Sequence, residues 1–183
     1  MLLKDGRSED FSKYLDEGGK IVNDDLGKKA EAKIKEWLNR PEEGYNFYRI
    51  PDQLSGNYLT SRNPCDFILY KHPYQYWIES KATYHDRWEF NSLTDFQYES
   101  LLKVSEINGV YGIVIVLFAT YQRAFVFDIR DIDSYIKTTG KKSLNIMKVD
   151  KWSIPYKEIR SVPNNRKRLL DYIGEIEEYL VGR

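Results

Sequence analysis

A carboxylate and an ammonium group lie two residues apart in a stretch that has the composition of a β-strand. The stretch is YWIESKATY at residues 76–84, and it places Glu79 and Lys81 among aromatic and aliphatic residues. Because side chains alternate along a strand, these two groups project to one face, while Ile78 and Ser80 project to the other. They could form a catalytic pair, or a solvated ion pair that contributes well under about 1 kcal/mol.

A second carboxylate is expected beside this pair. Asp66 begins the apolar run DFILY, thirteen residues before Glu79, and the tight KHP connection at 71–73 predicts an antiparallel hairpin that brings both residues together. Two carboxylates on adjoining strands form an oxygen-rich site that suits Mg²⁺ or Mn²⁺. A neighbouring Lys81 could orient or help to deprotonate an attacking water and stabilise negative charge on a phosphate. The combination is typical of phosphodiester hydrolysis.

Two further polar residues could join this site, and each has an alternative role. Glu31 lies at the edge of an apolar helical face, three residues before Ile34. Such a poorly solvated carboxylate could bind a cation, or it could pair with Lys35 one turn later. Gln97 lies just inside the next helix, where TDFQ at 94–97 also matches a capping box in which Gln97 bonds back to Thr94.

The order of predicted elements favours an α/β fold with a mixed central β-sheet flanked by helices. We expect helices at 24–38, 95–108, 132–137 and 167–181, and strands at 45–51, 65–70, 74–83, 110–118 and 124–129. We predict a single domain over 1–183, because no repeat or linker divides it. It comprises a loosely held N-terminus (1–20), a core (24–130), and a basic segment with a C-terminal helix (131–183).

The composition favours a cytoplasmic protein without a membrane partner. Cys65 is the only cysteine, so no intrachain disulfide can form, and the longest apolar run, 110–120, is too short to span a bilayer. Net charge is zero, but residues 141–168 contain nine basic and two acidic residues. Such a segment could face DNA, although a charge run is often only a solvated surface.

Four short motifs together resemble the PD-(D/E)XK nuclease superfamily, and more narrowly the RecU-type Holliday junction resolvases and their phage-associated relatives. The motifs are GKKAE (27–31), NPCDFILY (63–70), IESK (78–81) and FQ (96–97). The resemblance implies a restriction-endonuclease-like core in which Glu31, Asp66 and Glu79 surround Mg²⁺ or Mn²⁺, Lys81 assists the nucleophilic water, and Gln97 is the helix glutamine. It also implies a homodimer that cuts four-way DNA junctions. Phe96 replaces the usual histidine, and Cys65 separates Pro64 from Asp66.

Two segments carry groups suited to DNA. The expected loop at 82–91 presents Tyr84, His85, Arg87 and Trp88, although Trp88 could instead anchor a surface loop. Basic residues that could bind backbone phosphates are Lys141, Lys142, Arg166, Lys167 and Arg168. The sequence thus favours a metal-dependent endonuclease acting on branched DNA. A nuclease with a restriction or repair target, or a non-catalytic DNA-binding module, remains an alternative.

Overall fold

A mixed β-sheet forms the centre of the computed structural model, which describes residues 23–38, 45–51, 62–159 and 179–180. The helices are α1 (Asn23–Leu38), α2 (Asp95–Val104) and α3 (Ile129–Thr139), with short 3-10 turns η2 (Phe90–Ser92), η3 (Ala119–Tyr121) and η4 (Ile146–Lys151). The strands are β1 (Tyr45–Arg49), β2 (Phe67–Lys71), β3 (Tyr74–Thr83), β4 (Arg87–Glu89), β5 (Val110–Phe118), β6 (Arg123–Asp128), β7 (Ser143–Asn145) and β8 (Lys157–Ile159).

Six strands form the main sheet in the order β1-β2-β3-β5-β6-β8, and β4 pairs with β7 in a separate small sheet. Only β3 and β5 run parallel within the described sheets, and the other pairs are antiparallel. The parallel step needs a crossover connection, which the segment containing β4 and α2 supplies. The expected α/β class with a mixed central sheet flanked by helices is therefore confirmed.

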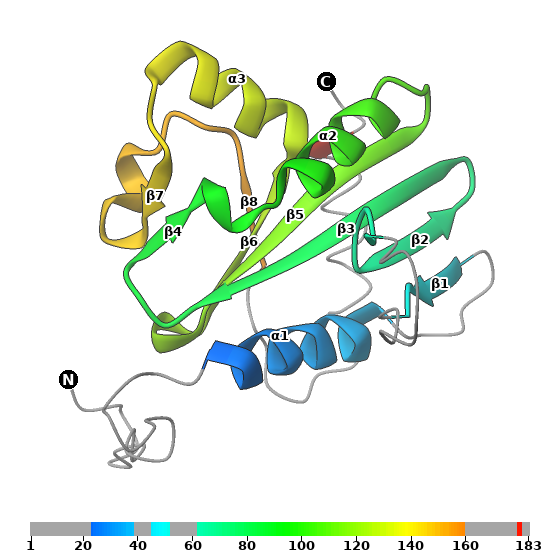
Figure 1. Ribbon diagram of the computed structural model, residues 1–183, viewed down its shortest axis with the longest axis horizontal. Helices are drawn as coiled ribbons and strands as arrows, with labels where there is room; N and C mark the ends of the chain where they lie inside the picture. Colours follow the sequence, from blue (N-terminus) through cyan, green and yellow to red (C-terminus); the bar gives the residue numbers. More distant parts are fainter. Residues whose placement is uncertain (1–22, 39–44, 52–61, 160–178, 181–183) are drawn as a thin grey trace.

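Each face of the sheet buries its own hydrophobic layer. Figure 1 shows α1 on one face and α2 with α3 on the other. Ala30 and Ile34 of α1 pack against alternate sheet residues such as Phe67 and Ile78. On the opposite face, Leu101 of α2 and aromatic residues of β6 belong to a second layer. The alternation along β2 and β3 thus directs one set of side chains to α1 and leaves the other facing α2.

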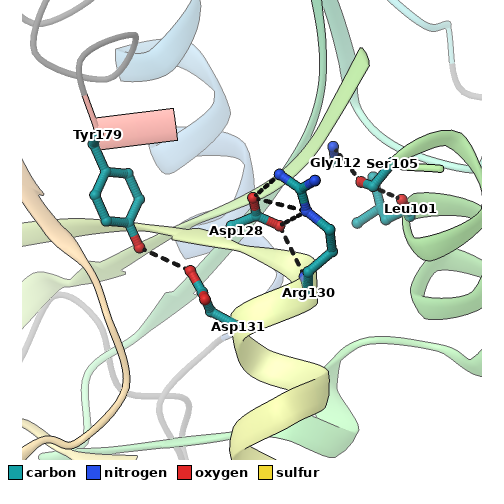
Figure 2. A network of polar contacts seen from close by, with 7 residues as sticks. All are labelled: Leu101, Ser105, Gly112, Asp128, Arg130, Asp131 and Tyr179. Carbon is teal, nitrogen blue, oxygen red and sulfur yellow. Dashed lines mark hydrogen bonds and ion pairs between the residues drawn. The ribbon is translucent and has the colours of Figure 1, made fainter. Parts of the chain in front are cut away.

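A buried hydroxyl ties the C-terminal end of α2 to the start of β5. The Ser105 hydroxyl donates to the Leu101 carbonyl at 2.8 Å and accepts the Gly112 amide at 2.8 Å (Figure 2). Gly112 is required there, because an added Cβ would lie 2.6 Å from the Leu101 oxygen. This contact fixes the helix whose other end carries Gln97.

The same view shows how α3 begins and where the C-terminal residues lie. The Asp128 carboxylate is buried, accepts the Arg130 backbone amide at 2.8 Å and is also bonded by the Arg130 guanidinium. An aspartate at this position satisfies the free amides of the first helical turn. Tyr179 donates to Asp131 of the same helix at 3.2 Å, so the described C-terminal residues contact α3.

The structure departs from the expected elements mainly where strands are short. The expected loop at 82–91 contains β4, and the basic segment after 141 contains β7. Strand β8 was not expected from the sequence either. Helix α2 ends at Val104 rather than 108, because Ser105 turns back to Leu101 and Gly109 adopts a positive φ of 80°. Helix α3 is longer than expected, from its Asp128 cap to Gly140.

Several expectations concern residues outside the described ranges. These are the N-terminal 1–20, most of the expected C-terminal helix, and Arg166, Lys167 and Arg168. No helix in the described part of the chain is long and apolar enough to cross a membrane.

Candidate active site

Asp66 lies where β2 begins and its pairing with β3 ends. Continuing the register Phe67↔Ile78 by one residue places Asp66 opposite Glu79, as the hairpin predicted. Beyond this point β3 continues to Thr83 without β2 beside it. The Ser80 backbone amide therefore has no β2 carbonyl to bond, and it donates instead to the Asp66 Oδ2 atom at 2.7 Å. The end of one strand thus fixes a carboxylate beside its neighbour.

Glu79 and Lys81 share one face of β3, as strand alternation requires. Lys81 Nζ lies 2.7 Å from Glu79 Oε1, and the side chains are 18% and 2% exposed, respectively. Such burial excludes the solvated ion pair that the sequence left open, because a buried carboxylate loses its hydration. The strand therefore carries a desolvated acid with an ammonium group directly beside it.

Gln97 both caps α2 and contacts the charged pair. Its backbone amide donates to Thr94 Oγ1 at 3.2 Å, and its Oε1 atom accepts the Thr94 amide at 3.1 Å, which completes the capping box. Its Nε2 atom donates to Glu79 Oε1 at 2.7 Å, and Oε1 also accepts from Lys81 Nζ at 3.3 Å. One amide group satisfies both roles because it can donate and accept at once.

Glu31 is engaged by an arginine that the sequence reasoning overlooked. Arg49 donates to Glu31 Oε2 from Nε at 3.1 Å and from Nη2 at 2.6 Å. The partner expected from helical spacing was Lys35, yet the carboxylate instead reaches the end of β1. A signal for Arg49 was present: it alternates with Phe47 in YNFYR and so shares the face that packs towards α1.

Arg49 stands next to Asp66 in the sheet. It pairs with Phe67, and the following Ile50 amide donates to the Asp66 carbonyl at 2.8 Å. Helix α1 and strands β1, β2 and β3 therefore converge at one end of the β2–β3 pairing, with an acidic residue from three of them.

Burial raises the pKa values of the two central carboxyl groups, and nearby carboxylates add to the rise. Burial raises the pKa of Glu79 to about 7, with the charge of Asp66 adding to the shift and Lys81 opposing it. Burial likewise raises the pKa of Asp66 to about 6, while the Ser80 amide opposes the rise and Glu31 adds to it. Holding both groups ionised at neutral pH therefore costs free energy, which a bound cation would recover.

The residues fit a divalent metal, although two of the carboxylates are held by side-chain cations. Glu79 Oε2 is buried and has no hydrogen-bond partner among the described residues. An unsatisfied buried carboxylate oxygen beside Asp66 is the donor that Mg²⁺ or Mn²⁺ prefers. In the described part of the chain no three His, Cys, Asp or Glu side chains are grouped as metal ligands. A cation that also used Glu31 would have to share that carboxylate with Arg49 or displace it.

The expected DNA contacts are partly rearranged by the small β4–β7 sheet. Arg87 lies opposite Asn145, and its Nη1 atom donates to Ser143 at 3.4 Å. The segment with His85 and Arg87 thus lies beside the one that follows Lys141 and Lys142. These four side chains are exposed, while Tyr84 is half-buried.

Trp88 was predicted to contact DNA, and this prediction is wrong. Its side chain is 2% exposed and packs against Phe90 and Phe127, with Nε1 donating to Ser92 at 2.8 Å. The Trp88 ring is part of the hydrophobic layer on this face of the sheet. It therefore anchors its segment, which is the alternative role that the sequence analysis gave for it. An aromatic residue in a polar loop does not by itself distinguish these two environments.

The sheet is of the mixed α/β class, and two carboxylates, a lysine and a glutamine meet at one end of the β2–β3 pairing. The sequence matches the model of the family described as "RecU: Recombination protein U" over residues 46–179. This range exceeds half of the chain, so the protein belongs to the Recombination protein U family, whose members are Holliday junction resolvases. The match includes Arg49, Asp66, Glu79 and Lys81, and it begins after Glu31.

Family membership makes the chain a Holliday junction-resolving nuclease. No curated protein matches it by sequence. Among solved structures, the chain is similar to the Holliday junction resolvase Hjc of Archaeoglobus fulgidus. That match has 18% sequence identity and a TM-score of 0.43, and covers 65% of this chain and 88% of the other.

Proposed function

We propose that the protein cuts four-way DNA junctions in a reaction that depends on Mg²⁺ or Mn²⁺ bound by Asp66, Glu79 and Glu31. The observation that carries this proposal is the buried Glu79, bonded to Lys81 and Gln97 on one oxygen and unsatisfied on the other. A protein that only binds DNA gains nothing from an acid whose burial opposes its ionisation. A hydrolase that loads a cation there recovers the cost.

Each side chain has a role that follows from its position. Asp66 and Glu79 hold the cation, which supplies Lewis-acid polarisation of the scissile phosphate when bound. Lys81 orients the attacking water and donates hydrogen bonds to negative charge that develops on the phosphate. Gln97 acts as a positioning residue, because its amide fixes Glu79 and Lys81 relative to each other.

Exposed cations in the segments around β4, β7 and η4 suit the DNA backbone. They are Arg87, Lys141, Lys142, Lys148 and Lys151, and we refer to them as the strip. Glu89, Asp86 and Asp150 are exposed in the same segments, so the strip is mixed rather than uniformly basic. Strand β4 follows β3, which carries Glu79 and Lys81. A DNA strand bound at these two residues would therefore lie near this surface. Contacts with phosphates there would make binding fall steeply with salt.

The decisive experiment compares substrates and metals. Labelled four-way junction, flap and duplex DNA are incubated with the protein in Mg²⁺, Mn²⁺ or EDTA, beside Glu79→Ala and Lys81→Ala. We expect metal-dependent cuts in the junction and none with either variant, while Lys137→Ala on α3 cuts like the wild type. Preferential cutting of flap or duplex would favour the repair or restriction alternative. Equal cutting by Lys81→Ala would refute the catalytic assignment.

We further propose that the active form is a homodimer, because resolution requires cuts in two symmetry-related strands of one junction. Light scattering of the purified chain at several concentrations measures this directly. A monomer that nevertheless makes both cuts in a single binding event would contradict it.

A further inference from the structure

The pairing of Arg49 with Glu31 conflicts with a metal role for Glu31 at the same time. Both guanidinium contacts fall on Oε2, and the side chains are 32% and 24% exposed, respectively. Two guanidinium nitrogens thus donate to a single carboxylate oxygen, and hydrogen bonds between charged groups are roughly twice as strong as those between neutral groups. A divalent cation at the same carboxylate would lie close to the Arg49 guanidinium, and repulsion between the two cations makes them compete for Glu31.

Arg49 is also placed where it could contact DNA. It lies at the end of β1, beside the Asp66 position on β2, and about a third of its side chain reaches solvent. A guanidinium fork matches the geometry of a phosphate group as well as that of a carboxylate. The scissile phosphate must approach Asp66 and Glu79 if those residues hold the cation. An arginine at this edge is then within reach of that phosphate or its neighbour.

We propose that Arg49 exchanges between two anions, Glu31 in the protein alone and a DNA backbone phosphate in the loaded complex. The proposal rests on the proposed function, since it takes Asp66 and Glu79 as the metal-binding pair. When DNA draws Arg49 away, Glu31 becomes available to the cation. When the cation takes Glu31, Arg49 becomes available to DNA. Arg49 thereby couples the two binding events.

This exchange makes metal and DNA binding mutually favourable. By linkage, DNA must tighten metal binding by the same factor as the metal tightens DNA binding. Coupling between two sites in proteins usually amounts to about 5- to 150-fold. The metal site would thus be occupied mainly when DNA is bound.

The first test uses Ca²⁺ alone, measured by calorimetry without DNA. Arg49→Gln keeps hydrogen-bonding capacity but removes the charge that competes for Glu31, so it should bind Ca²⁺ about fivefold more tightly than the wild type or better. The matched control is Arg123→Gln, which breaks a similar pair with Glu158 at 2.7 Å on β6 and β8. This control should bind Ca²⁺ like the wild type. Unchanged or weaker Ca²⁺ binding by Arg49→Gln would overturn the exchange.

The second test measures junction binding by fluorescence anisotropy in EDTA and in Ca²⁺, with gels to confirm that the DNA stays intact. Direct contact between a bound cation and phosphate contributes equally in both proteins, so the difference between their coupling factors reports Arg49. We expect Arg49→Gln to lose about fivefold or more of the coupling, and Arg49→Lys to lie between. Wild-type coupling in Arg49→Gln would refute the proposal.

Salt dependence gives an independent readout. If Arg49 binds a phosphate only in the Ca²⁺ complex, Arg49→Gln should lower the slope of log K against log salt by about 0.9 there and leave the slope in EDTA unchanged. Equal slopes for both proteins in Ca²⁺ would contradict the phosphate contact. Failure of the proposed function would appear differently, as absence of wild-type cleavage with Mg²⁺ or Mn²⁺, whereas the Ca²⁺ affinities measured without DNA test the Arg49–Glu31 exchange itself.

Discussion

Replacing Glu79 with glutamine should stabilise the protein while abolishing its activity. The wild-type carboxyl group has a pKa of about 7 in the folded protein, whereas a glutamate exposed to water has a pKa of about 4.5. The folded state therefore binds the proton more tightly than the unfolded state, and stability is lost as pH rises from about 4.5 through 7. At about pH 7.5 the loss approaches 3 kcal/mol, taking about 1.4 kcal/mol for each pKa unit. Glutamine does not ionise, so the variant does not lose this stability.

The assay is reversible unfolding in EDTA, followed over a series of pH values. For a chain of this length about 3 kcal/mol corresponds to a rise in midpoint of roughly 6–12 °C. We expect Glu79→Gln to exceed the wild type by that amount near neutral pH and to converge with it at about pH 4, where both side chains are uncharged. Saturating Mg²⁺ should raise the wild-type midpoint and leave that of Glu79→Gln nearly unchanged.

The exposed Glu99 on α2 provides the matched control. Glu99→Gln removes the same charge without relieving burial, so its midpoint should stay within the usual ±0.5 kcal/mol of a surface substitution. The reasoning is refuted if Glu79→Gln is no more stable than the wild type at neutral pH, or if it remains more stable at about pH 4. In either case burial of the ionised Glu79 carboxylate would not be what destabilises the wild type.

Further substitutions separate positioning from packing and binding. Gly112→Ala should lose about 1–3 kcal/mol of unfolding free energy, since its Cβ would lie 2.6 Å from the Leu101 oxygen, whereas Gly27→Ala on α1, with nothing within 4 Å, should gain up to about 1 kcal/mol. Thr94→Ala should lose about 0.5–2 kcal/mol as a helix cap but keep most cleavage activity. Gln97→Leu should lower cleavage about 10- to 100-fold; equal effects of both on cleavage would mean that the cap alone matters. Neutralising Arg87 and Lys142 together should reduce the salt slope of junction binding by about 1.8, with Lys137→Gln unchanged, and an unaltered slope would remove the β4–β7 sheet from the DNA surface.

Local patterns predicted the part of the site that lies within one hairpin. The tight connection at 71–73 fixes the register of β2 and β3, and register alone places Asp66 opposite Glu79. Strand alternation then puts Lys81 beside Glu79. These relations span fewer than about twenty residues, so the sequence carries them almost completely.

Contacts between distant segments were not predictable in the same way. Strands β4 and β7 are three residues long, and each is defined by its partner some 56 residues away rather than by its own composition. The same limit hid the environment of Trp88, which is buried by layers that assemble only in the folded chain. It also hid the Glu31 contact, where Lys35 was near in sequence but Arg49 was near in space.

The two cations at the site differ in burial and in the contacts that hold them, and this difference supports the roles proposed for them. Lys81 is on the same strand as Glu79, is 18% exposed, and is held by both Glu79 and Gln97. These contacts hold Lys81 beside the Glu79 carboxylate, where a group that assists the nucleophile is expected. Arg49 reaches Glu31 from another strand and is more exposed, at 32%. A long side chain at the rim can follow its anion from protein to DNA at little cost to the sheet. The more buried Lys81 therefore suits catalysis, and the more exposed Arg49 suits the proposed coupling of metal and DNA binding.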